Sequence, residues 1–107
     1  GGRHLRKYAE GELPQDRSFY FRGPDDRLKL RARNLISFMD LADGVDDDTW
    51  EFHLQRGEYS HWIRDAIKDP ELAEQIGELE QRHNLTAEQS RAEIRKAIEE
   101  RYTLPAG

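Results

Sequence analysis

From residue 34 onward, apolar residues recur every three or four positions, which is the period of an amphipathic helix. Four such stripes are Leu35, Phe38, Met39 and Ala42; Trp62, Ile63, Ala66 and Ile67; Leu72, Ala73, Ile76 and Leu79; and Ile94, Ala97, Ile98 and Tyr102. A further short helix fits the segment that begins near Trp50. The pattern therefore predicts four to five short helices. Charged residues of the last helix, including Arg91 and Arg95, are expected on its solvated faces.

Residues that cap helix N-termini stand in front of these stripes. They are Asn34, Asp48, Ser60, Asp69 and Thr86. Asp48 and Thr86 are each followed three residues later by Glu or Gln, which is the arrangement of a capping box. Asp69 is followed by a proline, which is tolerated in the first turn of a helix. We therefore expect helices to begin at these five positions.

Two glycines are expected to end helices. The first helix should run from Asn34 to about Asp43, and Gly44 should stop it by adopting the left-handed conformation. Gly57 should end the second helix in the same way.

A pattern with a period of two precedes the helices. Ser18 to Phe21 is rich in aromatic residues, and residues 27–32 alternate between basic and apolar side chains, which is typical of β-strands. Pro24 suits the second position of a turn between them. The sequence thus predicts a β-hairpin with an inner face made of Phe19, Phe21, Leu28 and Leu30. A lone ribbon is marginally stable, so this face should pack on the helices, which gives a mainly α (α+β) fold.

The length of the chain suits one domain. A chain of 107 residues leaves no room for two independent cores. We expect this single small domain to span residues 18–104. Residues 1–17 are polar and contain Gly11 and Pro14, so they are expected to be a linker or the end of a preceding domain. Gly1-Gly2 is typical of a remnant of tag removal.

The charge of the chain disfavours nucleic acid as a partner. The net charge is −5, whereas nucleic-acid binding needs clustered Lys and Arg. The alternating basic run consists of Arg27, Lys29, Arg31 and Arg33. On a strand these four side chains would share one face. That face is either a site for an anion or acidic partner or, as the simpler interpretation, the solvated outer face of the hairpin.

The chain contains no cysteine. This excludes disulfides and thiolate metal sites, and it suits a reducing compartment. No apolar run approaches the roughly 18 residues that a membrane-spanning helix needs. We therefore expect a cytoplasmic protein without a membrane partner.

The chemically richest segment runs from Trp50 to Trp62 and holds both tryptophans and two of the four histidines. Large aromatic side chains dominate small cores, so we expect this segment to join the second and third helices. The alternative is a binding surface. Its candidate residues are Trp50, His53, Glu58, Tyr59 and Trp62.

Metal and catalytic sites fit this segment poorly. His53, Glu58 and His61 are ligand types that suit zinc or iron, but the two histidines lie eight residues apart across a glycine, and there is no HExxH motif. Ser60 would need His53 or His61 as its base, and it lacks a Gly-x-Ser-x-Gly elbow. We therefore predict no catalytic residue, no metal and no cofactor in this chain.

Several segments of the chain resemble a known bacterial region. They are Phe19-Tyr20-Phe21-Arg22-Gly23-Pro24, Leu28-Lys29-Leu30-Arg31-Ala32, Ala42-Asp43-Gly44-Val45-Asp46 and the run from His53 to Trp62. That region is similar to an uncharacterised C-terminal accessory domain of bacterial haloacid-dehalogenase-like (HAD) phosphatases. The resemblance implies a parent phosphatase that uses Mg²⁺ and an aspartate nucleophile in an Asp-x-Asp motif after a strand. The run Asp46-Asp47-Asp48 follows a glycine and valine rather than an apolar strand, so no phosphatase residue carries over to this chain.

We therefore expect a non-catalytic accessory domain that contacts a parent catalytic domain, another protein or a regulatory ligand. Two alternatives stay open. A homo-oligomerisation module would use the hairpin edge and the surface that a thin core leaves uncovered. A small metal-binding protein or enzyme would use His53, Glu58 and His61.

Overall fold

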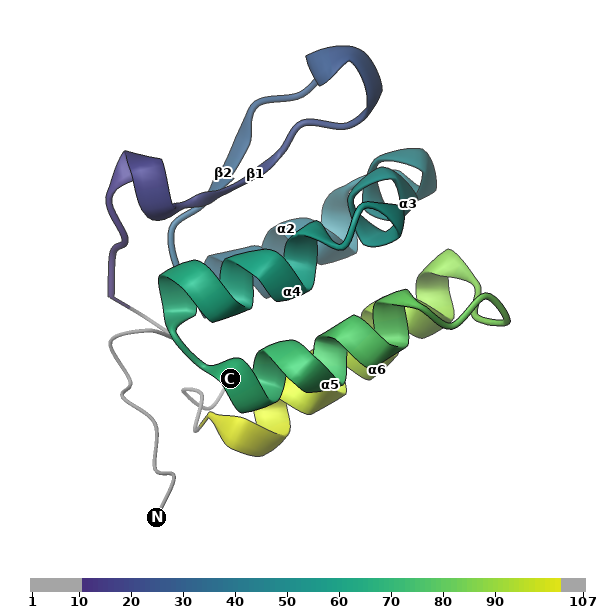
Figure 1. Ribbon diagram of the computed structural model, residues 1–107. Helices are drawn as coiled ribbons and strands as arrows, with labels where there is room; N and C mark the ends of the chain where they lie inside the picture. Colours follow the sequence, from purple (N-terminus) through teal and green to yellow (C-terminus); the bar gives the residue numbers. More distant parts are fainter. Residues whose placement is uncertain (1–10, 103–107) are drawn as a thin grey trace.

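Five α-helices and a two-stranded antiparallel hairpin form the computed structural model, which describes residues 11–102 (Figure 1). The strands are β1 (Phe19–Phe21) and β2 (Leu30–Ala32), and the helices are α2 (Leu35–Gly44), α3 (Asp47–Gln55), α4 (Glu58–Trp62), α5 (Pro70–Glu80) and α6 (Ala87–Arg101). Two 3₁₀ turns, η1 (Gln15–Arg17) and η2 (Pro24–Asp26), flank β1, and a π-helical turn, η3 (Ile63–Ile67), continues α4. The expected mainly α class with an N-terminal hairpin is confirmed.

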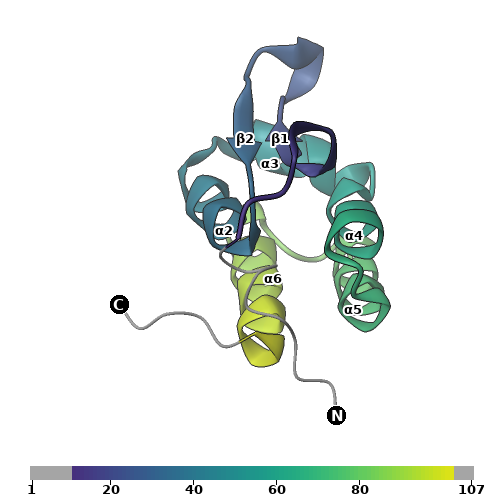
Figure 2. The ribbon, with the colours of Figure 1, turned by 90° about the vertical axis from the view of Figure 1, so that its left-hand side faces the viewer.

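The elements lie in three tiers. The hairpin covers one side of α2, α3 and α4, and α5 and α6 lie on the opposite side of these helices (Figures 1 and 2). Helix α5 packs against α4 and α6, while α6 also contacts α2 and α3. Apolar side chains from all three tiers therefore meet in one core.

The packed part of the chain begins before residue 18. Leu13 is buried in the core, and its amide donates to the carbonyl of Arg33 after β2 at 2.8 Å. The Nδ2 of Asn34 donates to the carbonyl of Gly11 at 2.8 Å. Residues 11–17, which were assigned to a linker, are thus attached to the domain. The rest of that linker and residues 103–104 lie outside the described residues.

The hairpin is shorter than its alternating sequence suggested. Phe19 pairs with Ala32 and Phe21 with Leu30, and both phenylalanines are buried as expected. Leu28 lies in the loop before β2, so its place on the inner face of a strand was wrong. Ala32, which is fully buried, completes the inner face instead.

Three of the five predicted helix caps are confirmed. The side chains of Asn34, Asp69 and Thr86 accept hydrogen bonds from backbone amides of α2, α5 and α6 at 2.8, 3.1 and 3.0 Å. Each satisfies an amide that has no partner within its own helix. Asp69 is itself buried, and the Arg101 guanidinium binds both of its oxygens at 2.8 and 2.9 Å.

The other two caps were predicted wrongly. Asp46, and not Asp48, caps α3 by accepting from the amide of Thr49 at 3.1 Å. Helix α4 begins at Glu58, before Ser60, and has no side-chain cap of its own. Instead, a carboxylate oxygen of Glu80 in α5 accepts from the amides of Tyr59 and Ser60 at 3.0 and 3.1 Å. A neighbouring helix thus supplies the cap that the local sequence lacks.

The two predicted glycine stops have different outcomes. Gly57 has φ +68° between α3 and α4, as expected. Gly44 has no positive φ and belongs to the last turn of α2, so the left-handed stop predicted there was wrong.

The end of α2 is held by a residue that was expected in solvent. The guanidinium of Arg91 in α6 donates to the carbonyls of Ala42 and Val45 at 2.8 and 2.7 Å. It also forms an ion pair with Asp47 at 2.8 Å. Carbonyls at the end of a helix lack partners within the helix, so this arginine is a C-terminal cap.

None of the helices within residues 11–102 has the length and apolar character needed to cross a membrane.

Replacing Gly23 with alanine should destabilise the fold. Gly23 has φ +74°, and a Cβ added there would lie 2.8 Å from the Oγ1 of Thr49 in α3. The strained backbone and the steric contact together should lower the free energy of unfolding by about 2 kcal/mol or more, measured by urea denaturation. Gly44→Ala is the matched control, because Gly44 has ordinary backbone angles and nothing lies within 4 Å of its added Cβ. Equal unfolding midpoints for the two variants would contradict this placement of Gly23.

Candidate binding groove

His53 connects α3 to the hairpin and is 2% exposed. Its Nε2 accepts hydrogen bonds from the backbone amides of Arg22 and Gly23 at 3.0 and 3.2 Å. Its Nδ1 lies 2.5 Å from an oxygen of Glu58. Because two N–H groups point at Nε2, that nitrogen must carry the lone pair, and the proton must be on Nδ1, which donates to Glu58. Both ring nitrogens are therefore used inside the fold.

The residues considered above as an alternative metal site or nucleophile are engaged elsewhere in the fold. The lone pair of His53 is taken by backbone amides, and His61 is exposed and lies 2.9 Å from Asp65 in an ion-pair geometry. Within residues 11–102, no three His, Asp or Glu side chains come together as metal ligands. The hydroxyl of Ser60 donates to the carbonyl of Gly57 at 3.2 Å, so it is engaged in the first turn of α4.

Glu58 is held as a carboxylate. Burial acts to raise its pKa, but the hydrogen bonds from His53 and from Arg56, at 2.9 Å, outweigh it and keep the pKa of Glu58 below its usual value. Glu80 behaves in the opposite way, because burial raises its pKa more than the amides of Tyr59 and Ser60 lower it. Glu58 and Glu80 both lie at the start of α4, and their pKa values are shifted in opposite directions.

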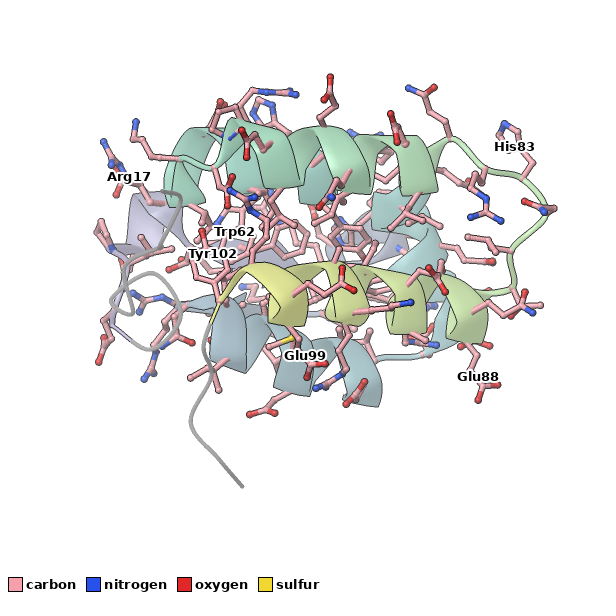
Figure 3. All side chains as sticks on the ribbon, turned by 90° about the horizontal axis from the view of Figure 1, so that it is seen from below. Arg17, Trp62, His83, Glu88, Glu99 and Tyr102 are labelled. Atoms are coloured by element: carbon pink, nitrogen blue, oxygen red, sulfur yellow. The ribbon has the colours of Figure 1, made fainter. Side chains whose placement is uncertain are left out.

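The aromatic members of the predicted binding set lie in the core. Trp50 and Tyr59 stack with ring centroids 4.4 Å apart, and the Tyr59 hydroxyl donates to the Trp50 carbonyl at 2.8 Å. Trp50 donates in turn to the hydroxyl of Ser90 in α6 at 2.8 Å. Trp62 lies among the helices, and its indole N–H donates to the carbonyl of Arg17 at the edge of the molecule at 2.7 Å (Figure 3). These side chains join the three tiers of the fold.

A groove of about 570 Å³ opens above this core, between the hairpin and the helices α3 and α4. Residues 16–20 and Arg22 form one wall, and Phe52 of α3 and Arg56, the residue after α3, form part of the other. His53 and Trp62 line it only by their edges, since both are buried. We call this feature the hairpin groove.

The hairpin groove differs in composition from the opposite surface. It contains three arginines, four large aromatic residues, two histidines and four acidic residues, and no lysine. The exposed faces of α5 and α6 carry mainly Glu, Gln and Lys, and Glu88 and Glu99 project outward from α6 (Figure 3). Protein interfaces are enriched in Arg and aromatic residues and depleted in Lys, Glu and Asp. The groove, and not the α5–α6 surface, therefore has the arginine and aromatic content of a contact surface, and its acidic residues are the feature that departs from that composition.

Charges in the groove fall into two groups. Arg56 is paired with Glu58, and His61 with Asp65. Four other charged side chains of the groove make no ion pair within residues 11–102: Asp16, Arg17, Arg22 and Asp26. The unpaired charges belong to the hairpin and to the turn before it.

The basic run 27–33 does not form one strand face, because β2 begins only at Leu30. Arg27 binds Asp46 at 2.6 Å in front of α3. Arg31 donates to the hydroxyl of Ser18 and to the carbonyl of Leu13, both at 2.9 Å. Lys29 and Arg33 are exposed. Two of the four cations are therefore used to hold the hairpin in place.

Sequence patterns did not single out Arg17, Arg22 or Phe52 as groove residues. They come from three separate elements, and nothing in their spacing indicates that they share a surface. The position of Arg22 between an aromatic strand and a Gly-Pro turn is the only local sign that its side chain leaves the hairpin.

A comparison of the chain with protein-family models, with curated proteins and with solved structures found no match. The class of protein must therefore be inferred from the fold and the groove themselves.

His53→Ala should destabilise the protein. The change leaves the amides of Arg22 and Gly23 and the carboxylate of Glu58 without their partner and opens a cavity, so we expect a loss of about 3 kcal/mol or more in urea denaturation. His61→Ala is the control, because His61 is exposed, and it should unfold close to the wild type. Equal stability of the two variants would mean that His53 does not hold the hairpin.

The two shifted carboxyl groups predict opposite pH dependences. Because its folded pKa is lowered, Glu58 stabilises the fold at pH values above its usual pKa of 4.5. This stabilisation is lost as the pH falls through the folded pKa. The destabilisation caused by Glu58→Gln should therefore grow from pH 3 to pH 6. Glu80 has a raised pKa, so its contribution is lost as the pH rises, and the cost of Glu80→Gln should shrink over the range above pH 4.5. Denaturation curves at several pH values measure both slopes, and slopes of the same sign would contradict the assignment.

Proposed function

We propose that this chain is a non-catalytic interaction domain whose hairpin groove docks a segment of another protein or of a parent enzyme. The main support for this proposal is that one set of polar groups is bonded within the fold and another is not. His53, Glu58 and Ser60 are engaged in bonds within the fold, whereas Arg17 and Arg22 reach the groove without an ion-pair partner in residues 11–102.

His53 is buried with both ring nitrogens bonded, so it cannot act as a base or ligand without losing bonds that hold the fold, and the partly exposed Glu58 and Ser60 are bonded to neighbours in the same fold. Unpaired arginines beside half-buried aromatic rings can gain contacts at no such cost. A groove of this size, with mixed polar and apolar walls, suits an extended peptide segment.

The parent enzyme suggested by sequence resemblance is a HAD-like phosphatase. In that arrangement the aspartate nucleophile and Mg²⁺ would belong to the parent domain, and this chain would be its accessory domain in the bacterial cytoplasm. The absence of cysteines is compatible with that compartment. The isolated chain, supplied with Mg²⁺, should then hydrolyse no p-nitrophenyl phosphate. Turnover that persists through purification and is lost in His53→Gln would contradict a non-catalytic role.

Self-association is the second candidate function. The groove carries unpaired Asp16 and Asp26 beside unpaired Arg17 and Arg22, so two copies related by a two-fold axis could exchange ion pairs. Light scattering over a range of protein concentrations separates the candidates, because a monomer at every concentration would exclude self-association through this surface.

Docking at the groove can be tested without knowledge of the natural partner. A random 12-residue peptide library displayed on phage is selected against the immobilised protein, and enriched peptides are synthesised and titrated into the ¹⁵N-labelled protein. We expect the largest amide shifts in residues 16–22, in α3 and in α4. Phe52→Ala should weaken binding by about tenfold, which is the effect of losing an aromatic contact residue.

Leu85→Ala is the matched control, because Leu85 is half-buried between α5 and α6 and outside the groove. It should leave affinity unchanged. If no peptide is enriched, or if the shifts map to α5 and α6, the proposed function is wrong.

A further inference from the structure

Three arginines in the described part of the chain lie over aromatic rings. Arg22 lies 5.5 Å from the ring centroid of Tyr20, Arg56 5.1 Å from that of Phe52, and Arg91 5.5 Å from that of Trp50. Arg56 also binds a carboxylate of Glu58 at 2.9 Å, and Arg91 binds one of Asp47 at 2.8 Å. Arg22 is thus the ring-stacked arginine of residues 11–102 that has no carboxylate.

Hydrogen bonds hold the backbone of Arg22 and the ring beside its side chain. Its backbone amide donates to His53 at 3.0 Å, and the ring beneath it is anchored because the Tyr20 hydroxyl donates to the carbonyl of Gln15 at 3.0 Å. A guanidinium over the face of an aromatic ring keeps its N–H groups available to a further partner. The planar fork of donors in an arginine matches the two oxygens of a carboxylate.

We propose that Arg22 binds the carboxylate of an Asp or Glu side chain in a partner protein segment that lies in the hairpin groove. Arg17, which lines the same groove and is also unpaired, supplies a second positive charge. This inference rests on the proposed docking function and specifies its partner as an acidic segment. Arg56 and Arg91 show how the same chain completes such a stack with a carboxylate.

Asp16 and Asp26 line the groove as well and oppose an acidic partner. They form no ion pair with Arg17 or Arg22, so they do not occupy the arginine donors. Like charges placed close together weaken binding, and the removal of one should therefore strengthen it. Asp26 and Arg22 thus provide two substitutions in one groove with opposite expected effects.

The test uses the peptides enriched on phage, the folded protein and isothermal titration calorimetry. Enriched sequences should share an Asp or Glu at a fixed position. Arg22→Gln should weaken binding by about tenfold, Asp26→Asn should strengthen it, and Arg82→Gln, an exposed arginine outside the groove, should leave it unchanged. Thermal unfolding of each variant verifies that it is folded.

A double-mutant cycle completes the experiment. Changing the fixed Asp or Glu of the peptide to its amide should weaken binding to the wild type by about tenfold and should have little further effect on Arg22→Gln. If peptides bind in the groove and the amide version binds equally well, the carboxylate inference is wrong while docking stands. If no peptide binds in the groove, both are wrong.

Discussion

The buried imidazole of His53 is the central attachment of the hairpin to the helices. Strands of three residues cannot form a stable ribbon alone. Phe19 and Phe21 supply apolar contacts. His53 fixes the position of the hairpin, because its Nε2 accepts hydrogen bonds from the amides of Arg22 and Gly23 where the chain leaves β1. The missing side chain of Gly23 allows α3 to approach this closely. The hairpin groove depends on the same bond, because one of its walls belongs to the hairpin and the other to α3.

Much of the fold follows from local sequence. The period of the apolar residues gives the helices and their buried faces, and Asn34, Asp69 and Thr86 act as caps where a capping residue precedes a stripe. The failures have non-local causes. The cap of α4 comes from Glu80, which lies 21 and 20 residues from the two amides that it binds. The local capping-box pattern with Glu51 favoured Asp48, whereas the cap is Asp46, whose carboxylate also binds Arg27 of the hairpin.

The site was only partly accessible to sequence reasoning. His53 and Glu58, which lie close together in the chemically rich segment, are in contact in the structure. Their contact is a hydrogen bond that holds the fold together. Arg17, Arg22 and Phe52 become neighbours only after the hairpin folds over α3. What these three residues share is an arginine or aromatic side chain that remains at least partly exposed at the groove. That exposure depends on tertiary contacts and has no sequence signature.

The role of Arg91 affects the order in which this chain can become native during synthesis. The ribosome releases α2 long before it releases Arg91, whose guanidinium lies on carbonyls 46 and 49 residues earlier in the chain. Until α6 emerges, the last turn of α2 can have only water as a partner for those oxygens. Helix α2 is therefore completed only when α6 is made, and a nascent chain stalled before α6 would leave the α6-facing sides of α2 and α3 exposed to other proteins in the cell.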